Sequence, residues 1–189
     1  ERWQRIGVYA AGLALTDAGV LGNAALLDKT DLSVAAGNGD RDLALDGAVL
    51  DKLAATPDDP GLLNRQLMTG LRPTLYLGEL SNLLAGNIQI VLKVTGSSRT
   101  FKGEEMAGIA ALEDGFRRIA AGTSQIALVG GALNAEREDL LLNMELAGVL
   151  HRGAFAGVWR RGETGGMCLG SIGAFLVLES RAHAEARGA

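Results

Sequence analysis

The sequence predicts an α/β protein, in which helices cover a sheet of buried strands. The main observation is the stretch 98–131, whose composition changes from a short strand to a turn, an amphipathic helix and an apolar strand. A second apolar run follows at residues 171–179. With 189 residues, 48% apolar and 21% charged, the chain is an ordinary globular domain that is long enough to bury a core.

The stretch 98–131 has clear internal signals. Ser98, Thr100 and Phe101 have the composition of a strand, and Gly103 marks the turn that follows. Apolar residues then recur every three or four positions and form one stripe of a helix: Met106, Ile109, Leu112, Phe116 and Ile119. Gly122 ends this helix, and the unbroken apolar run from Gln125 to two glycines is typical of a strand covered on both faces.

The remaining elements follow from the same signals, with Gly19 ending the first helix and Pro73 starting a later one. Predicted helices cover residues 2–18, 41–53, 62–68, 74–85, 137–146 and 181–187. Predicted strands cover residues 31–36, 88–94, 98–101, 125–131 and 171–179. A turn at Gly86-Asn87 separates the helix 74–85 from the strand 88–94, and residues 147–170 are a glycine-rich irregular segment. The loop at 133–138 follows a strand's carboxyl end, where α/β proteins usually place a site.

Composition excludes several classes of function. The formal net charge of −4 gives no electrostatic reason to expect nucleic acid or an anionic membrane as a partner. No apolar run approaches the roughly 20 residues of a membrane helix, and there is no signal-peptide pattern. The single cysteine excludes an intrachain disulfide and a multi-cysteine zinc site, and it fits the cytoplasm. Gly37 and Gly39 lack the spacing of a nucleotide-binding loop, and we expect no cofactor and no metal.

Glu104 and Glu105 stand at the predicted start of the helix in the central stretch. Unpaired backbone N–H groups and the helix dipole favour negative charge there, which is a sufficient structural explanation for two acidic residues. The start of a helix is also a common position for a catalytic nucleophile, because its backbone N–H groups can donate to an oxyanion.

The central stretch resembles the nucleophile region of the β-ketoacyl-acyl-carrier-protein synthases (ketosynthases) of the thiolase-like superfamily. The residues that match the family pattern are Asn82, Gly96, Thr100, Gly108, Ala111, Ile119, Gly122, Ala127, Gly130 and Gly131. The tail also matches, at Gly170, Leu176, Val177, Leu178, Glu179, Ala184, Arg187, Gly188 and Ala189. The sequence departs from the pattern at Ser171, where the family has glutamate, and at Gly165, where it usually has aspartate.

The largest departure is at the nucleophile. The family's catalytic cysteine stands three residues before Gly108, and this chain has Glu105 there. A carboxylate is a weak nucleophile and its anhydride with an acyl group is far more labile than a thioester, so Glu105 is a poor replacement. In the family, members without this cysteine are chain-length factors, which pair with an active ketosynthase, or loading-type decarboxylases, which carry glutamine.

The resemblance implies a thiolase-like half, with a mixed five-stranded sheet between helices. Residues 1–189 match most of the first half of a ketosynthase, without its opening strand and without the second half, and the start at Glu1 suggests a piece of a longer chain. The family's two catalytic histidines belong to that second half. His151 and His183 match neither position, so we expect both to be surface or structural residues, and Cys168 to be structural.

The resemblance also implies partners. Ketosynthases are dimers in which the strand before the nucleophile pairs across the twofold axis; here that strand is Ser98, Arg99, Thr100, Phe101 and Lys102. An alternative explanation is that Arg99 and Lys102 are charges that protect a solvent-facing edge. An acidic acyl carrier protein would need a basic patch, for which Arg117, Arg118, Arg160 and Arg161 are candidates.

Three functional hypotheses remain open from the sequence. The favoured one is a non-condensing subunit, chain-length-factor-like, that forms a homodimer or a heterodimer with an active ketosynthase in fatty-acid or polyketide assembly. The second is a malonyl-carrier-protein decarboxylase or condensing enzyme whose second half supplies the histidines. The third is an α/β domain whose binding function lies elsewhere. Whether the chain is itself an enzyme is left undecided by the missing cysteine.

Overall fold

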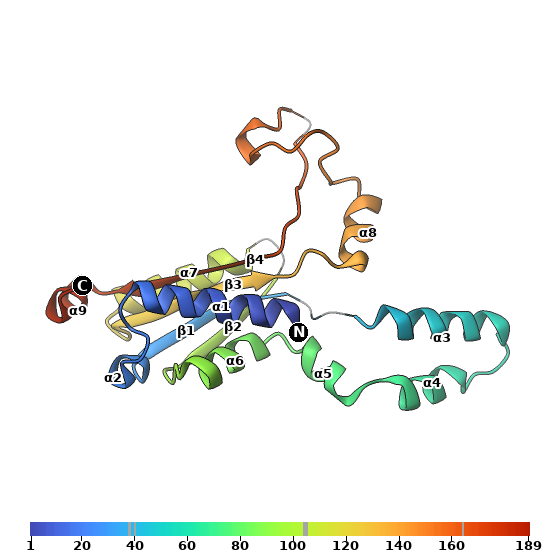
Figure 1. The fold of residues 1–189 in the computed structure, drawn as a ribbon, viewed down its shortest axis with the longest axis horizontal. Coiled ribbons are helices and arrows are strands. Elements are labelled where there is room, and N and C mark those ends of the chain that lie inside the picture. Colours follow the sequence, from blue (N-terminus) through green and yellow to red (C-terminus); the bar gives the residue numbers. More distant parts are fainter. Residues whose placement is uncertain (38, 40, 104–105, 164) are drawn as a thin grey trace. The chain divides into compact units, whose positions relative to one another are not determined.

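A computed structural model of the chain describes residues 1–37, 39, 41–103, 106–163 and 165–189. The chain divides into two compact units, one made of residues 1–37 and 81–189 and one made of residues 38–80. The first unit contains the sheet (Figure 1). The second unit is helical within its described residues and comprises α3 (Leu43–Ala55), α4 (Leu62–Gly70) and α5 (Pro73–Glu79), of which α3 and α4 pack together.

The sheet of the first unit has four strands among the described residues, in the order β2-β1-β3-β4. The strands are β1 (Thr30–Ala36), β2 (Ser98–Lys102), β3 (Ile126–Leu133) and β4 (Ile172–Glu179). Strand β1 pairs in parallel with both β2 and β3, whereas β3 and β4 are antiparallel, so the sheet is mixed. The α/β class and the mixed sheet are therefore confirmed, and the expectation of five strands is wrong.

The fifth predicted strand, residues 88–94, is helical. It lies mainly in α6 (Leu83–Leu92), which also includes the residues predicted to form a turn at Gly86-Asn87. Leu84 and Ile88, four residues apart, are fully buried, whereas Ile90 is 68% exposed. This burial at helical spacing, and not the β-branched composition, decides the conformation, because strand propensity depends strongly on tertiary context.

The predicted helix 74–85 is likewise divided between two elements, α5 and α6, with an extended residue at Leu80. Pro73 occupies the first turn of α5, as the sequence predicted. The other helices of the first unit agree with their predicted positions within a few residues. They are α1 (Arg2–Asp17), α7 (Ala107–Ala120), α8 (Glu138–Leu146) and α9 (Arg181–Arg187), with a short additional helix α2 (Ala24–Leu27) and a 3₁₀ turn η1 (Val158–Arg160).

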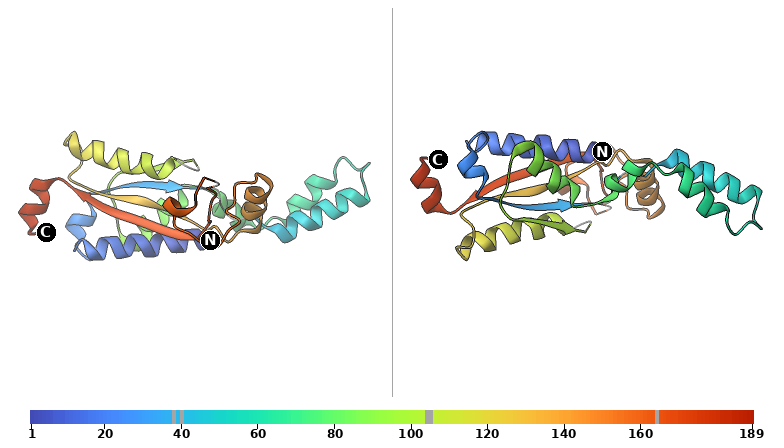
Figure 2. Two further views of the ribbon diagram at one scale, coloured as in Figure 1. Left: turned by 90° about the horizontal axis from the view of Figure 1, so that it is seen from above. Right: turned by 90° about the horizontal axis from the view of Figure 1, so that it is seen from below.

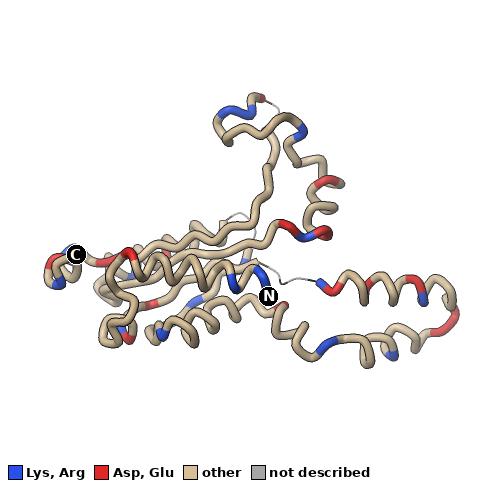
Figure 3. The backbone as a smooth tube through the Cα atoms, in the orientation of Figure 1, with Lys and Arg blue, Asp and Glu red and all other residues tan. Residues whose placement is uncertain are grey.

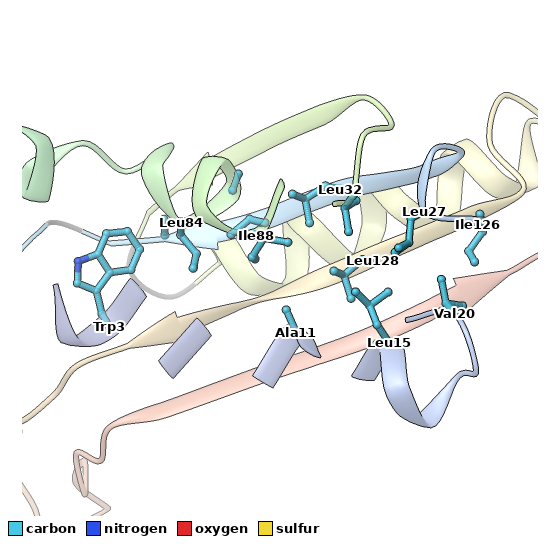
Figure 4. Close-up of a cluster of buried hydrophobic side chains, with 14 residues drawn as sticks. Trp3, Ala11, Leu15, Val20, Leu27, Leu32, Leu84, Ile88, Ile126 and Leu128 are labelled. Atoms are coloured by element: carbon cyan, nitrogen blue, oxygen red, sulfur yellow. The ribbon is translucent and has the colours of Figure 1, made fainter. Parts of the chain in front are cut away.

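Helices cover both faces of the sheet (Figure 2). Helices α1 and α6 lie on one face, and α7 lies on the other, against β1, β2 and β3. The main apolar core is on the α1 and α6 side, where alternate residues of β1 and β3 meet large helix side chains (Figure 4). Its labelled members are Trp3, Ala11, Leu15, Val20, Leu27, Leu32, Leu84, Ile88, Ile126 and Leu128.

Gly96 shows how closely the connection before β2 approaches the sheet. A Cβ atom at this position would lie 2.2 Å from the carbonyl oxygen of Thr30, which no side chain can tolerate. The residue after it, Ser97, donates its backbone N–H and its hydroxyl to Asp31 Oδ1, both at 2.9 Å. The glycine that the family pattern marks is therefore required by the close packing of two backbone segments.

Candidate functional site

The carboxyl ends of the parallel strands meet at one edge of the sheet. Ala36 at the end of β1 is in register with Lys102 of β2 and Ala132 of β3, and Ile172 at the start of β4 lies opposite Leu133. The connections to α7 and α8 both leave from this edge. Such an edge is where α/β proteins commonly build their sites, because the loops can vary while the strands hold their positions.

Glu105, which the sequence analysis predicted to stand at the position of the family nucleophile, lies outside the described residues, as does Glu104. The flanking elements are described: β2 ends at Lys102 and α7 begins at Ala107. The strand and the helix predicted within residues 98–120 are confirmed by these two elements. The role of Glu105 stays a prediction.

A group of polar side chains occupies the same edge and was not predicted from the sequence. Ser171, directly before β4, accepts a hydrogen bond from the Ala135 backbone N–H at 3.1 Å. Its hydroxyl lies 2.8 Å from Glu136 Oε2 and 3.2 Å from Asn134 Oδ1, and its single proton can be donated to one of these oxygens at a time. Arg2 of α1 forms an ion pair with the same Glu136 oxygen at 2.7 Å.

This arrangement explains one departure from the family pattern in local terms. Ser171 stands where the family has glutamate, and Glu136 brings a carboxylate directly to its hydroxyl. Asn134 is only 7% exposed, and its amide oxygen also lies 3.4 Å from the Glu136 backbone N–H. The group connects the end of β3 to the start of β4, and sequence reasoning did not find it because Asn134 and Ser171 are 37 positions apart in the chain.

Buried charges hold α7 against the sheet. Asp114 accepts a hydrogen bond from the Ser33 hydroxyl of β1 and one from Arg99 of β2, both at 2.6 Å. Near the end of the helix, Arg118 pairs with Asp31 of β1 at 2.7 Å, and its side chain is only 18% exposed. These contacts place α7 across β1 and β2, because Asp114 accepts from a residue of each strand and Arg118 pairs with a carboxylate of β1.

The face of α7 that lies on the sheet is made of small residues. Ala107, Ala111 and Gly115 are its buried positions, spaced by four. A Cβ atom at Gly115 would lie 2.4 Å from Val129 Cγ1 of β3, so the helix approaches the sheet too closely for any larger residue. The sequence contains this four-residue spacing of small residues, but the interpretation of the helix rested on its large apolar residues.

The apolar stripe predicted on this helix exists, but four of its five members face solvent. Met106 is 63% exposed, Ile109 57%, Leu112 40% and Phe116 65%. On the same side of the sheet, Ile172 and Leu176 of β4 are 60% and 56% exposed, since Phe175 and Val177 point to the core on the other side. We call Ile109, Leu112, Phe116, Ile172 and Leu176 the exposed apolar face.

The predicted dimer strand is β2, and it is an edge of the sheet formed by the described residues. Ser98, Arg99 and Lys102 are exposed, whereas Thr100 and Phe101 are half-buried. The Arg99 side chain is held by Asp114 of α7, which gives it a role inside the unit. Helix α6, which contacts β2, exposes Ile90 and Val91, and the sequence reasoning missed both because it assigned them to a strand.

The two histidines and the cysteine belong to segments of the chain that follow α8. His183 on α9 contacts Glu179 Oε1 through Nδ1 at 2.7 Å, and Arg187 donates two hydrogen bonds to the same carboxylate. Arg187, assisted by His183, holds the pKa of Glu179 below its usual range. His151 belongs to the segment between α8 and β4, and Cys168 is a half-buried free thiol of that segment.

The four candidate arginines do not form one basic patch. Arg117 and Arg118 are in the last turn of α7, which leads into the start of β3. Arg160 and Arg161 belong to the segment between α8 and β4, which connects to the opposite, carboxyl edge of the sheet. Arg117 pairs with Glu113 and Arg118 with Asp31. Charges of both signs are interspersed along the backbone (Figure 3). Within the described residues, no cluster of three or more His, Cys, Asp or Glu could hold a metal ion.

A mixed α/β sheet between helices, with α7 entering from the carboxyl edge, places the protein in the thiolase-like class. A crystal structure of a β-ketoacyl synthase from Burkholderia phymatum STM815 matches this fold over 100% of the chain, with a TM-score of 0.77 and 20% identity. The family follows from the sequence itself. Residues 1–184 match the N-terminal domain of β-ketoacyl synthases, and the chain belongs to this family.

Two other solved structures are similar. The ishigamide ketosynthase/chain length factor is 26% identical over the whole chain, with a TM-score of 0.69. A type II polyketide synthase acyl-carrier protein in complex with its ketosynthase (AntDE:AntF) is 21% identical, with a TM-score of 0.67, again over the whole chain. The chain covers 44%, 43% and 50% of these three structures, and thus at most half of their length. Curated proteins gave no significant match. None of the described helices has the length and apolarity needed to cross a membrane.

Proposed function

We propose that this chain is part of a non-condensing, chain-length-factor-like partner of an active ketosynthase in fatty-acid or polyketide assembly. The observation that carries the proposal is Glu105 at the position of the family's nucleophilic cysteine. A carboxylate there cannot store an acyl group as a thioester, so the condensing step would fall to the partner's cysteine. The similar ketosynthase/chain length factor structure supports the same assignment. The proposed compartment is the reducing cytoplasm, which suits the free thiol of Cys168.

The proposed interface is the open edge of β2 together with α6. An unpaired strand edge readily pairs with another chain, and the exposed Ile90 and Val91 of α6 add apolar area beside it. The partner is a ketosynthase, either a second copy or an active relative. An acyl carrier protein is the proposed third component, on the analogy of the complex described above.

The interface test uses two matched substitutions. Ile90→Asp places a charge beside β2. The control, Leu13→Asp, places the same charge on α1, at a position that is 54% exposed. We expect Ile90→Asp to weaken self-association or ketosynthase binding at least about tenfold, because a buried unpaired charge is costly, and Leu13→Asp to leave it unchanged. Sedimentation velocity with and without a ketosynthase measures this. Equal behaviour of the two variants, or no association of the parent chain, would refute the interface.

A second function is favoured by the exposed apolar face. A second α/β half of the same protein would cover Ile109, Leu112 and Phe116 of α7, and it would bring its own histidines to the α7 amino end. The full protein would then be a malonyl-carrier-protein decarboxylase or a condensing enzyme. Glu105→Ala in the full protein should then change the rate of CO₂ release from malonyl-carrier protein. A partner subunit without this activity would release no CO₂ in either form.

A further inference from the structure

Helix α3 of the second unit has two apolar sides, and one of them packs on α4, the next helix along the chain (Figure 1). On this side lie Val49, which is buried, and Leu45, whose Cδ1 is 2.5 Å from the position that a Cβ at Gly70 would take. Lys52 belongs to the same side, since its Nζ donates to Gln66 Oε1 at 2.5 Å. These positions, separated by four and three residues, mark the side of α3 that faces α4.

The opposite side of α3 carries a second stripe of apolar and small residues. We call this stripe the α3 seam: Leu43, Gly47, Leu50 and Ala54. Its spacing of four, three and four residues is that of the a and d positions of a coiled coil, and 3.6 residues per turn place it opposite the contact with α4. All four members are exposed, Leu43 to 41% and Leu50 to 65%. The described residues of the chain therefore leave an apolar helix surface uncovered.

Gly47, in the middle of the seam, is unexplained by contacts within the described residues. Glycine inside a helix is less favourable than alanine, and its usual structural reasons are a positive φ or the close approach of another segment. The φ of Gly47 is not positive, and a Cβ atom there would meet nothing within 4 Å. A helix that packed closely on the seam from outside the described residues would supply the missing reason.

The second unit also has little internal core. Among its described residues, only Val49 has a buried side chain. Its helices have 13, 9 and 7 residues, and helices of this length are marginal in water unless an amphipathic face is packed. A helix that covered the seam would add the burial that this unit lacks.

The charges beside the seam decide what can cover it. Asp46 and Asp51 flank the seam, one on each side, at the positions that correspond to g and e of a coiled coil. Asp46 pairs with Arg41 at 2.8 Å, whereas Asp51 is exposed. Lys52, the only basic residue of α3, is turned to α4. A second copy of this chain would set aspartate against aspartate in either orientation, so the charges favour a different helix with basic flanks.

We propose that the α3 seam binds an amphipathic helix of a partner protein, whose apolar stripe covers the seam and whose flanking positions carry lysine or arginine. The two helices lie along one another, the apolar contact gives the affinity and the flanking charges select the partner. This interface is separate from the ketosynthase interface proposed at β2 and α6, and it does not depend on that proposal.

Two designed peptides test the seam with the complete 189-residue chain. Both consist of three heptads with leucine at a and d; one has lysine at e and g and the other has glutamate, so that neither pairs well with itself. Fluorescence anisotropy of the labelled peptides at low salt measures binding. We expect the lysine peptide to bind at least about tenfold more tightly than the glutamate peptide, because Asp51 attracts the first and repels the second.

Three variants locate the binding on the chain. Leu50→Ser removes an exposed apolar side chain from the seam and should weaken binding of the lysine peptide at least about tenfold. Asp51→Lys, also at an exposed position, should invert the preference, so that the glutamate peptide binds more tightly. The matched control is Leu142→Ser on α8, where the side chain is 58% exposed, and it should leave both affinities unchanged.

Each other outcome would contradict the proposal. Absence of binding, equal binding of the two peptides, or a preference for lysine that survives Asp51→Lys would remove the charge argument. An unchanged affinity in Leu50→Ser, or an equal loss in Leu142→Ser, would place the peptide elsewhere on the chain. Self-association of the chain that Leu50→Ser abolishes, measured by sedimentation velocity, would assign the seam to a second copy.

Discussion

The two faces of the sheet are packed in opposite ways. On the α1 and α6 face, large side chains such as Trp3, Leu15 and Ile88 fill the space between helix and strands. On the α7 face, the contact is made by Ala107, Ala111 and Gly115 and by buried charges, and the large apolar residues point away from the sheet.

This difference indicates what each face is for. A helix that turns Ile109, Leu112 and Phe116 outward has a second apolar surface to bury, whereas α1 has most of its own apolar side against the core. Under the functions proposed above, α7 is a middle layer between this sheet and another part of the assembly, while α1 forms an outer layer. Three predictions test that distinction.

The largest effect is expected in the core of the α1 and α6 face. Leu128→Ala removes a fully buried side chain from β3 and leaves a cavity, so the free energy of unfolding should fall by about 2–5 kcal/mol. Leu112→Ala on α7, at 40% exposure, is the matched control and should cost well below this. Urea unfolding followed by circular dichroism measures both. Similar losses for the two would mean that the α7 stripe is packed as tightly as the core.

Two glycine substitutions in α7 are expected to have smaller effects on stability, and these effects have opposite signs. Gly115→Ala places a Cβ 2.4 Å from Val129 Cγ1 and should destabilise the protein by about 1–3 kcal/mol through overpacking. Gly108→Ala on the same helix meets open space and should stabilise it by up to about 1 kcal/mol, because alanine favours the helix. Thermal unfolding of the two variants measures the difference. A stabilised Gly115→Ala would show that α7 lies farther from the sheet than described.

The smallest effect on stability is expected at the outward stripe. Phe116→Glu alters a side chain that is 65% exposed, so the free energy of unfolding of this chain should change by no more than about 0.5 kcal/mol. The same substitution should abolish binding of whatever covers α7. A large loss of stability in the isolated chain would instead place Phe116 in an internal contact, and the distinction between the two faces would fail.

Sequence reasoning succeeded where a signal was local. The strand Ser98–Lys102, the helix that follows it and the apolar strand ending in two glycines all appear close to their predicted positions. It failed at residues 88–94, where β-branched residues suggested a strand, because burial of Leu84 and Ile88 favours a helix. The contact between Ser171 and Glu136 was not predicted, since 34 residues separate them in the chain and only the antiparallel pairing of β3 and β4 brings them together.

The sequence by itself determined the class of the protein and the order of most of its main elements, since composition, periodicity and motif order can be recognised without knowing which residues meet in space. Only the tertiary structure decided which side of α7 meets the sheet. A helix with apolar residues on one side and small residues on another can bury either, and the close approach at Gly115 with the ion pairs of Asp114 and Arg118 selects the small side. The apolar stripe is thereby left exposed among the described residues.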